Sequence, residues 1–280
     1  MHTVENFSGR LNSPRAASTA SGGTALTTTA GLISIPLGAD WISVTPRNFV
    51  GCGVARFTFN PYLTIVVTNN LLLTPGTDVS AEAQDGDTTA ITAFNSLDTL
   101  ANGDAVYIGA VEPFRGVGVV MSGANSVASN LSVDYWDGAT WTAVSTLSDG
   151  TDTGAAFATN GNITWDVPAL WAKSSLKSNG AVTASDAAFK DSFTTKAPYI
   201  ANLYFVRVTT SAAFDASSEP SAIRALNRYT SYAELLEGQV FESTIKSEGP
   251  GGVACVEALT DAGTANLIVN VAIKHDGEYE

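Results

Sequence analysis

Histidine and cysteine are nearly absent from this chain of 280 residues, which contains two of each. The histidines, His2 and His275, lie near opposite ends of the sequence. A Ser-His-Asp or Cys-His nucleophile needs a positioned imidazole, and a zinc site needs closely spaced His and Cys ligands. Neither pattern occurs, and the glycine-rich segments lack the lysine and spacing of a phosphate loop. The sequence therefore predicts a protein that is not an enzyme and holds no cofactor or metal.

The two cysteines, Cys52 and Cys255, are far apart in the sequence. One disulfide could join them in a secreted protein, whereas two buried free thiols are commoner in a protein made in the cytosol. We expect free thiols, although the spacing alone leaves a disulfide open.

Charge is also scarce, because only 15% of the residues are charged. Against 27 acidic residues there are 14 Lys and Arg, which gives a formal net charge of −13. Phosphate groups are bound mostly by Lys and Arg, so we expect neither nucleic acid nor an anionic membrane as a partner. No stretch approaches the roughly 18 consecutive apolar residues of a membrane span. The first residues contain no apolar segment typical of a signal peptide, so we expect a soluble protein.

The mixture of Leu, Glu and Lys that favours long helices is missing as well. Instead, segments rich in β-branched and aromatic residues are bounded by Gly, Pro and Asn, which is typical of β-strands. In one such segment Ala55, Phe57 and Phe59 alternate with Arg56 and Thr58. This period of two indicates a strand with one buried face.

The predicted fold is all-β, with two β-sandwich or jelly-roll-like domains, the second inserted into the first. Residues 1–31 are expected to form an extended N-terminal arm, because residues 6–31 contain no acidic side chain and are mostly small and polar. The next β segment has too few strands to form a sandwich alone. We therefore combine residues 32–85 with residues 220–280 in a discontinuous β domain and assign residues 86–219 to the inserted sandwich.

Three further segments give local predictions. The apolar, β-branched run at residues 267–273 predicts a central strand of a sheet. The sequence SAIRALNRYT at residues 221–230 predicts a short helical turn. Residues 174–197 form a polar excursion between two predicted strands, and its length indicates an outer loop.

Tryptophan is concentrated in one short stretch, with Trp136, Trp141, Trp165 and Trp171. Sugars stack on exposed aromatic rings, so these residues are candidates for a carbohydrate-binding platform, with Trp136 and Trp141 as its site. However, strand alternation places Tyr135 and Trp136 on opposite faces, and a large ring more often fills the core of a small sandwich. We expect core positions and keep the carbohydrate platform as the alternative.

Aspartate and glycine define several turns. Asp137-Gly138 suits a tight turn between Trp136 and Trp141, and the DGAT spacing predicts a four-residue hairpin loop. Carboxylates also flank glycine at Asp85 and Asp87 and at Asp149 and Asp152. Such turns can bind calcium, but Asp and Gly are also ordinary turn formers and no full EF-hand loop is present. Both interpretations stay open.

Several motifs together give the chain a resemblance to a known family. They are a YIG strand, PFRG, the hairpin YWDGATW, a DGT turn, WDVP, and the strand LYFVRVTTSAAFDASSE, preceded by TALTTTAGLISIPLGADWISVTPRNF. This pattern resembles a module of structural proteins in the virions of tailed bacteriophages, and it covers most of the chain.

The resemblance implies a non-enzymatic role in the virion, which would be assembled in the host cytoplasm. The most probable role is a capsid decoration or cement protein that binds the major capsid protein, or neighbouring virion proteins, and stabilises the shell. The predicted contact residues lie in the arm: Phe7, Arg10, Leu11 and Arg15. A homo-oligomer is expected, with a trimer favoured. The alternative is a carbohydrate-binding adhesion module on a tail or fibre.

Overall fold

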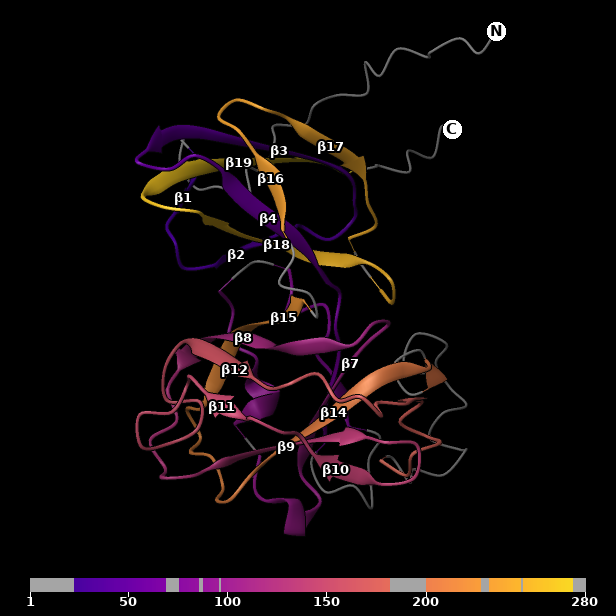
Figure 1. Cartoon of the computed structure of the whole chain (residues 1–280). Coiled ribbons are helices and arrows are strands. Elements are labelled where there is room, and N and C mark those ends of the chain that lie inside the picture. The colour runs from indigo at the N-terminus through magenta and orange to yellow at the C-terminus, as the bar shows by residue number, and fades with distance from the viewer. Residues whose placement is uncertain are drawn as a thin grey trace, which may run out of the picture.

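The computed structural model describes residues 23–68, 76–85, 88–95, 97–181, 200–227, 232–247 and 249–273. These residues form antiparallel β-sheets arranged in two lobes, with short 3-10 turns at Thr92–Phe94 and Leu100–Asn102 (Figure 1). The predicted all-β, sandwich-type fold is therefore confirmed. We call the two lobes upper and lower, as they stand in Figure 1.

The upper lobe is a sandwich of two four-stranded sheets built from both ends of the described chain. The first sheet has the order β1 (Thr24–Leu26), β19 (Thr264–Ile273), β3 (Ala39–Val50) and β17 (Phe241–Thr244). The second has the order β16 (Ala233–Leu235), β4 (Ala55–Pro61), β18 (Val253–Thr260) and β2 (Gly31–Ser34). Since β19 lies between β1 and β3, the central strand predicted at residues 267–273 is confirmed.

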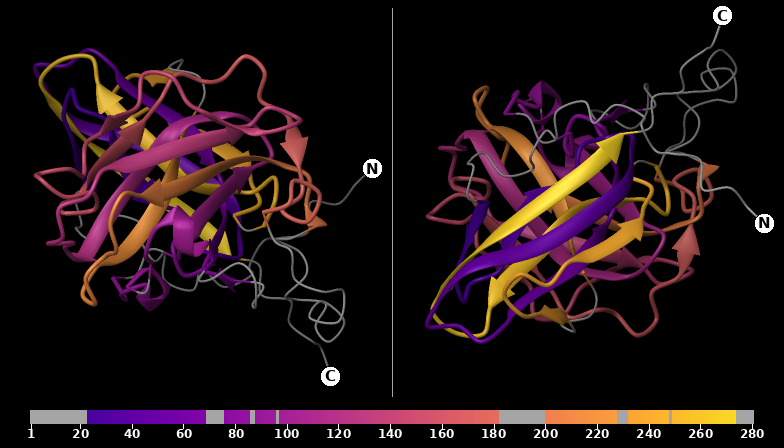
Figure 2. Two further views of the ribbon diagram at one scale, coloured as in Figure 1. Left: turned by 90° about the horizontal axis from the view of Figure 1, so that it is seen from below. Right: turned by 90° about the horizontal axis from the view of Figure 1, so that it is seen from above.

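The lower lobe contains the remaining strands, again in two sheets. Its larger sheet has the order β10 (Trp141–Ala143), β9 (Leu131–Trp136), β14 (Leu203–Thr210), β7 (Ala105–Ala110), β5 (Thr64–Thr68) and β6 (Thr77–Asp78), with β13 (Lys173–Ser174) also paired to β14. Its smaller sheet has the order β11 (Ser148–Asp149), β12 (Gly161–Thr164), β8 (Phe114–Gly123) and β15 (Glu219–Asn227). Seen along the long axis of the molecule, the strands of the two lobes cross one another (Figure 2).

Apolar side chains explain why these sheets stack. In β4 the alternation predicted from the sequence is confirmed, because Ala55 and Phe57 are buried and Phe59 packs against the same core. That core fills the upper lobe between its two sheets. The lower lobe has a corresponding core between its sheets and a further cluster on the outer face of its larger sheet, beneath residues 173–181. Residues 174–181 of the predicted outer loop are thus packed on a sheet, and residues 182–197 lie outside the described residues.

Sheet membership does not follow the predicted domain limits. Strands β5 and β6, placed by the sequence in the discontinuous domain, pair within the larger sheet of the lower lobe. Strand β15 pairs with β8 of the lower lobe and replaces the predicted helical turn over residues 221–227, whereas residues 228–230 lie outside the described residues. The division into two folding domains, one inserted in the other, stays a prediction, but the pairing of strands changes lobe between β4 and β5 and again between β15 and β16.

The predicted arm of residues 1–31 needs a correction at its end. Residues 24–26 form β1, which pairs with β19, and the side chain of Leu26 is buried in the upper core. An apolar residue at this position lets the segment join the sheet, although its neighbours are small and polar. Residues 1–22, with Phe7, Arg10, Leu11 and Arg15, lie outside the described residues.

Candidate functional site

A buried carboxylate lies where the two lobes meet. Glu257 of β18 is only 1% exposed, and it forms an ion pair with Arg115 of β8 in the other lobe, with 2.7 Å between Oε1 and Nη2. The Tyr232 hydroxyl donates to Oε1 at 2.6 Å, and the Asn60 side-chain amide donates to Oε2 at 2.9 Å. We call Asn60, Arg115, Tyr232 and Glu257 the junction cluster.

The junction cluster is built at the two places where the chain passes between the lobes. Asn60 lies near the end of β4, just before the first passage to β5, and Tyr232 precedes β16 after the second passage. Both passages are therefore tied to one carboxylate, which also holds Arg115 of the lower lobe. Removing Asn60 would leave Oε2 without its donor, and removing Arg115 would leave the buried charge of Glu257 without its counter-ion, and both losses are costly.

The electrostatics of the junction favour fixed protonation states. Burial, followed by the hydrogen bond to Glu257, raises the pKa of Tyr232 to about 12, so its hydroxyl remains a donor at neutral pH. Burial raises the pKa of the neighbouring Cys255 thiol to about 12. Since the thiolate is the reactive form, this cysteine is a poor nucleophile. Both Cys52 and Cys255 are free thiols in the structure.

The hydrogen bonds of the Glu257 carboxylate are made within the junction cluster rather than to a ligand. The Glu257 oxygens accept three hydrogen bonds, from an arginine, a tyrosine and an asparagine. Asn60 Oδ1 and the Nε atoms of Arg115 and Arg224 are buried without a hydrogen-bond partner. Burial lowers the pKa of Arg224. The carboxylate of Glu257 is already bonded to residues of both lobes, so the junction cluster holds the lobes together rather than binding a ligand.

The four clustered tryptophans fall into two pairs. Trp165 and Trp171 are buried in the lower core, and their indole N–H groups donate to the carbonyl oxygens of Phe114 and Phe205. The expected core position is therefore found for these two. Trp136 and Trp141 are only partly buried and lie opposite each other on β9 and β10.

The hairpin between β9 and β10 has the loop length expected from DGAT. Trp136 pairs with Trp141, so residues 137–140 form the four-residue loop. The Asp137 carboxylate accepts the backbone N–H groups of Ala139 and Thr140, and these two bonds are the main reason that its pKa is lowered to about 2. Gly138 takes a φ of 106°, which suits glycine.

At the other acidic turns the described carboxylates cap the backbone. Asp149 accepts the backbone N–H and the hydroxyl of Thr151, and Asp152 accepts the backbone N–H of Gly154. These contacts are those of ordinary Asx turns. No group of three or more metal-ligating side chains occurs within the described ranges, so Asp85 belongs to no such group there. Asp87, His2 and His275 lie outside those ranges.

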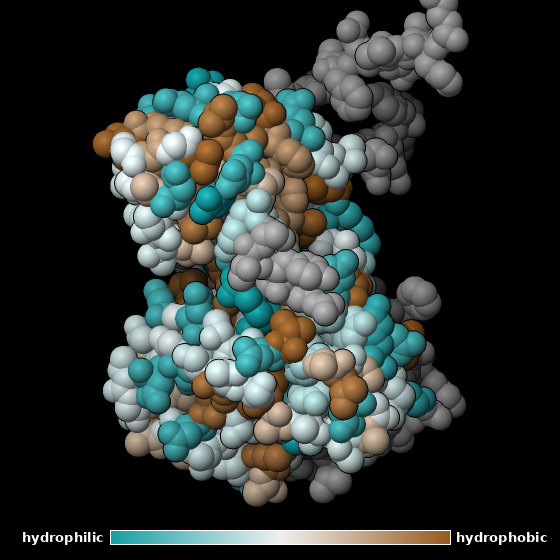
Figure 3. All heavy atoms as spheres, viewed as in Figure 1, coloured by the Kyte–Doolittle hydropathy of each residue, from teal (hydrophilic) through white to brown (hydrophobic). Residues whose placement is uncertain are grey.

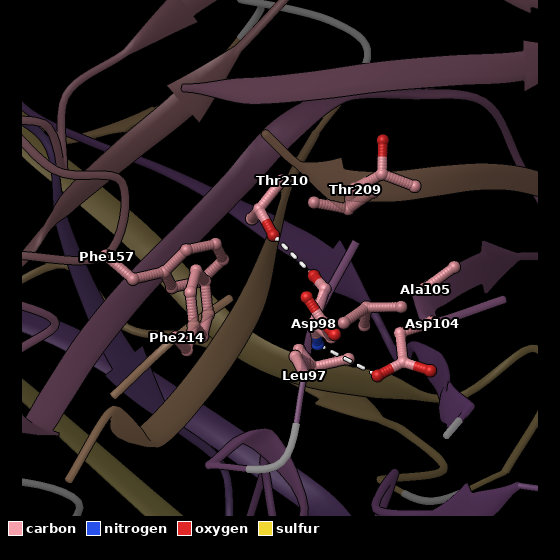
Figure 4. Close-up of a pocket in the computed structure, with 10 residues that line it drawn as sticks. Leu97, Asp98, Asp104, Ala105, Phe157, Thr209, Thr210 and Phe214 are labelled. Carbon is pink, nitrogen blue, oxygen red and sulfur yellow. Dashed lines mark hydrogen bonds between the residues drawn. The ribbon is translucent and has the colours of Figure 1, made fainter. Parts of the chain in front are cut away.

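A small pocket opens beside the lower core (Figure 4). Asp104 accepts the backbone N–H of Asp98, and the Thr210 hydroxyl donates to the carbonyl oxygen of Asp98, so both backbone groups of Asp98 are already paired. Its volume is about 10 Å³, which is room for one water molecule. The pocket is too small for an organic ligand.

The junction cluster was missed by the sequence analysis. One signal was available, since Glu257 is a charged residue within the apolar strand sequence VACVEALT, where a buried acid requires a partner. The identity of that partner was hidden, because Arg115 is 142 residues away along the chain.

Comparisons with family models, with curated proteins and with solved structures found no match to this chain. In the part of the chain that the structure describes, no helix has the length and apolar character needed to cross a membrane.

Proposed function

We propose that the chain is a non-enzymatic structural protein of a tailed-phage virion and acts as a decoration or cement protein on the head. It would bind the shell of major capsid protein and stabilise it by adding contacts between neighbouring subunits. The sequence motifs support this proposal, because the YIG strand, the YWDGATW hairpin and the WDVP segment all belong to the lower lobe and contribute to its sheets or core.

The main structural support is that the described chain begins and ends in one sheet. Strand β1 starts at Thr24 and pairs with β19, which ends at Ile273. Residues 1–22 are therefore joined to the upper lobe, while β9 and β10 lie at the far end of the lower lobe (Figure 1). This polarity suits a protein that is anchored through its arm and upper lobe and presents its lower lobe outward.

Three exposed apolar residues of the upper lobe support the same orientation. Val50, Leu236 and Val240 are 67%, 54% and 55% exposed. The backbone N–H of Phe49 donates to Glu237, which holds the turn after β16 beside the end of β3, and Val240 precedes Phe241, which pairs with Val44 further along β3. Exposed hydrophobic side chains are scattered among polar ones on the face seen in Figure 3, so these three residues would add to a contact area rather than supply it alone.

The arm differs in charge from the chain as a whole, because it carries two arginines and the whole chain is acidic. Arg10 and Arg15 lie in a segment without acidic residues, within a chain of net charge −13. We propose that these arginines, with Phe7 and Leu11, contact the capsid or a neighbouring copy.

The test is a deletion of residues 1–22, which leaves β1 and the buried Leu26 in place. The proposal predicts that the truncated protein keeps its thermal unfolding midpoint but no longer sediments with capsids that lack the full-length protein. As a matched control, the double variant with Arg10→Ser and Arg15→Ser should bind more weakly than wild type at low salt, and raising the salt should reduce its affinity less than that of wild type, because it has fewer charges to screen. If the deletion variant binds capsids as well as wild type, the arm does not contribute to capsid binding.

Position and assembly need separate measurements. A copy number comparable to that of the major capsid protein, counted from images of the intact particle, would place the protein on the head. A much smaller number would place it on the tail and overturn the cement proposal. Light scattering of the purified chain tests the proposed homotrimer.

A further inference from the structure

One face of the larger sheet in the lower lobe brings two tryptophans beside an ion pair. Trp136 lies opposite Trp141 across β9 and β10, and Asp134 lies opposite Arg207 across β9 and β14. Asp134 and Trp136 are two residues apart on one strand, and directly opposed residues share a face, so all four side chains are on the same side. We call these four residues the aromatic face.

The tryptophan rings leave aromatic surface uncovered. Their centroids are 5.6 Å apart at an interplanar angle of 63°, an edge-to-face contact. In this geometry the two rings cannot cover each other's faces, so at least one face of Trp136 is not covered by Trp141. Trp141 is supported from below by Tyr107, with centroids 5.6 Å apart, and by the Arg207 guanidinium, 5.3 Å from its centroid. Trp136 makes no other ring contact among the described residues.

The ion pair keeps free hydrogen-bonding groups next to these rings. Arg207 donates from Nε and Nη2 to Asp134 Oδ2, at 3.2 and 2.7 Å. Arg207 Nη1 and Asp134 Oδ1 have no hydrogen-bond partner within the described part of the chain, and neither atom is sealed from solvent. The side chains are 18% and 17% exposed, so a fixed donor and a fixed acceptor reach the surface together.

We propose that the aromatic face binds a saccharide, with a pyranose ring lying on Trp136. The C–H face of a pyranose is apolar and packs on an indole, while adjacent hydroxyl groups need a donor and an acceptor held side by side. Arg207 Nη1 and Asp134 Oδ1 supply that pair, already oriented by their mutual bonds. This inference is independent of the proposed place in a virion.

The buried tryptophans determine how saccharide binding can be measured by fluorescence. Trp165 and Trp171 are buried and will emit at short wavelength whether or not a sugar binds. The informative signal is therefore the change in emission on adding ligand, which should come from Trp136. The probe is an array of neutral and acidic oligosaccharides, followed by fluorescence titration with the strongest binder.

We expect Trp136→Ala to weaken binding about tenfold or more, because it removes the stacking surface. Trp136→Leu keeps apolar volume without the ring and should show the same loss, which covers the case in which the alanine variant does not fold. Asp134→Asn should weaken binding while Arg207 remains in place. The matched control is Trp41→Ala, which removes a partly exposed tryptophan from β3 of the upper lobe and should leave affinity unchanged.

Two results would overturn the proposal. One is the absence of binding to every glycan on the array by the folded wild-type protein. The other is binding that Trp136→Leu leaves intact, or that Trp41→Ala reduces equally. Either result would mean that the aromatic face only packs against the apolar cluster around Tyr107 and binds no saccharide.

Discussion

The two lobes differ in how many faces of their sheets are buried. In the upper lobe one core fills the space between the sheets, with Phe57, Phe59 and Phe241 in mutual contact. In the lower lobe the larger sheet is packed on both faces, between the main core and a second cluster. Every residue of β5 and β7 is buried as a result.

This difference indicates separate tasks for the lobes. A sheet covered on both faces behaves as a rigid interior, because all its side chains are confined by neighbours. In the upper lobe the outer face of the sheet that contains β18 meets the lower lobe through Glu257, and residues 1–22 precede β1 in the other sheet. On the lower lobe the β9–β10 edge is partly open, because Trp136 and Trp141 are only partly buried. The following predictions test how far the lobes are independent.

The largest effect is expected from Trp171→Ala in the lower core. Its ring packs against Phe114, Tyr135 and Tyr204, and its indole N–H is bonded to Phe205. Replacing a buried tryptophan should lower the free energy of unfolding by about 3–5 kcal/mol. Urea unfolding measures the change, and the partly exposed Trp136 provides the control. An equal loss in Trp136→Ala would contradict the distinction between the two tryptophan pairs.

Glu257→Gln tests the tie between the lobes. It leaves Arg115 without its carboxylate in a buried site, so we expect a loss of about 3 kcal/mol. It should also separate one unfolding transition into two if the tie couples the lobes. Arg56→Gln breaks the exposed pair of Arg56 with Glu234 and should cost less than about 1 kcal/mol. Comparable losses in both variants would show that the junction has no special role.

Gly118→Ala tests the close approach of the lobes at a second point. A methyl group on Gly118 would lie 2.6 Å from Cδ1 of Leu32 on β2, across the junction. Leu32 lies on an edge strand and can shift, so we expect a loss of about 1 kcal/mol. The double variant with Leu32→Ala should lose less than the sum of the two single variants. Simple additivity would mean that the lobes are not in contact there in solution.

The smallest effect concerns the hairpin turn of the lower lobe. The lowered pKa of Asp137 means that its charged form stabilises the folded state above the unfolded value near 4. This contribution should disappear as the pH falls towards about 2. Asp137→Asn should therefore be less stable than wild type at neutral pH and equal to it at the acid end. A difference that persists at low pH would contradict the role of the carboxylate charge.

Local patterns in the sequence predicted much of the fold but not its long-range contacts. The alternation at Ala55 and Phe57 and the four-residue loop after Trp136 were correct, because both depend on neighbours in the chain. The helical turn at residues 221–230 was wrong. Strand β15 is buried on both sides, so it lacks the alternation that marks a half-exposed strand.

The candidate sites show the same limit. Trp136 and Trp141 were recognised from their spacing, but Arg207 enters the aromatic face only through the pairing of β14 with β9. The junction cluster depends on pairs of residues from β4, β8 and β18, which the sequence keeps far apart. No local signal relates such residues, since only the folded topology brings them together.

The position of β1 beside β19 has a mechanical consequence. The two strands are antiparallel, so the start of β1 and the end of β19 point out of the sheet in the same direction. Tension between these ends would separate the Thr24–Leu267 pair first, then Ala25 from Asn266, and then Leu26 from Ala265. The lower lobe is outside this load path, because both of its connections return to the junction cluster. Pulling on the arm would therefore loosen the attachment before it deformed the body that the arm holds.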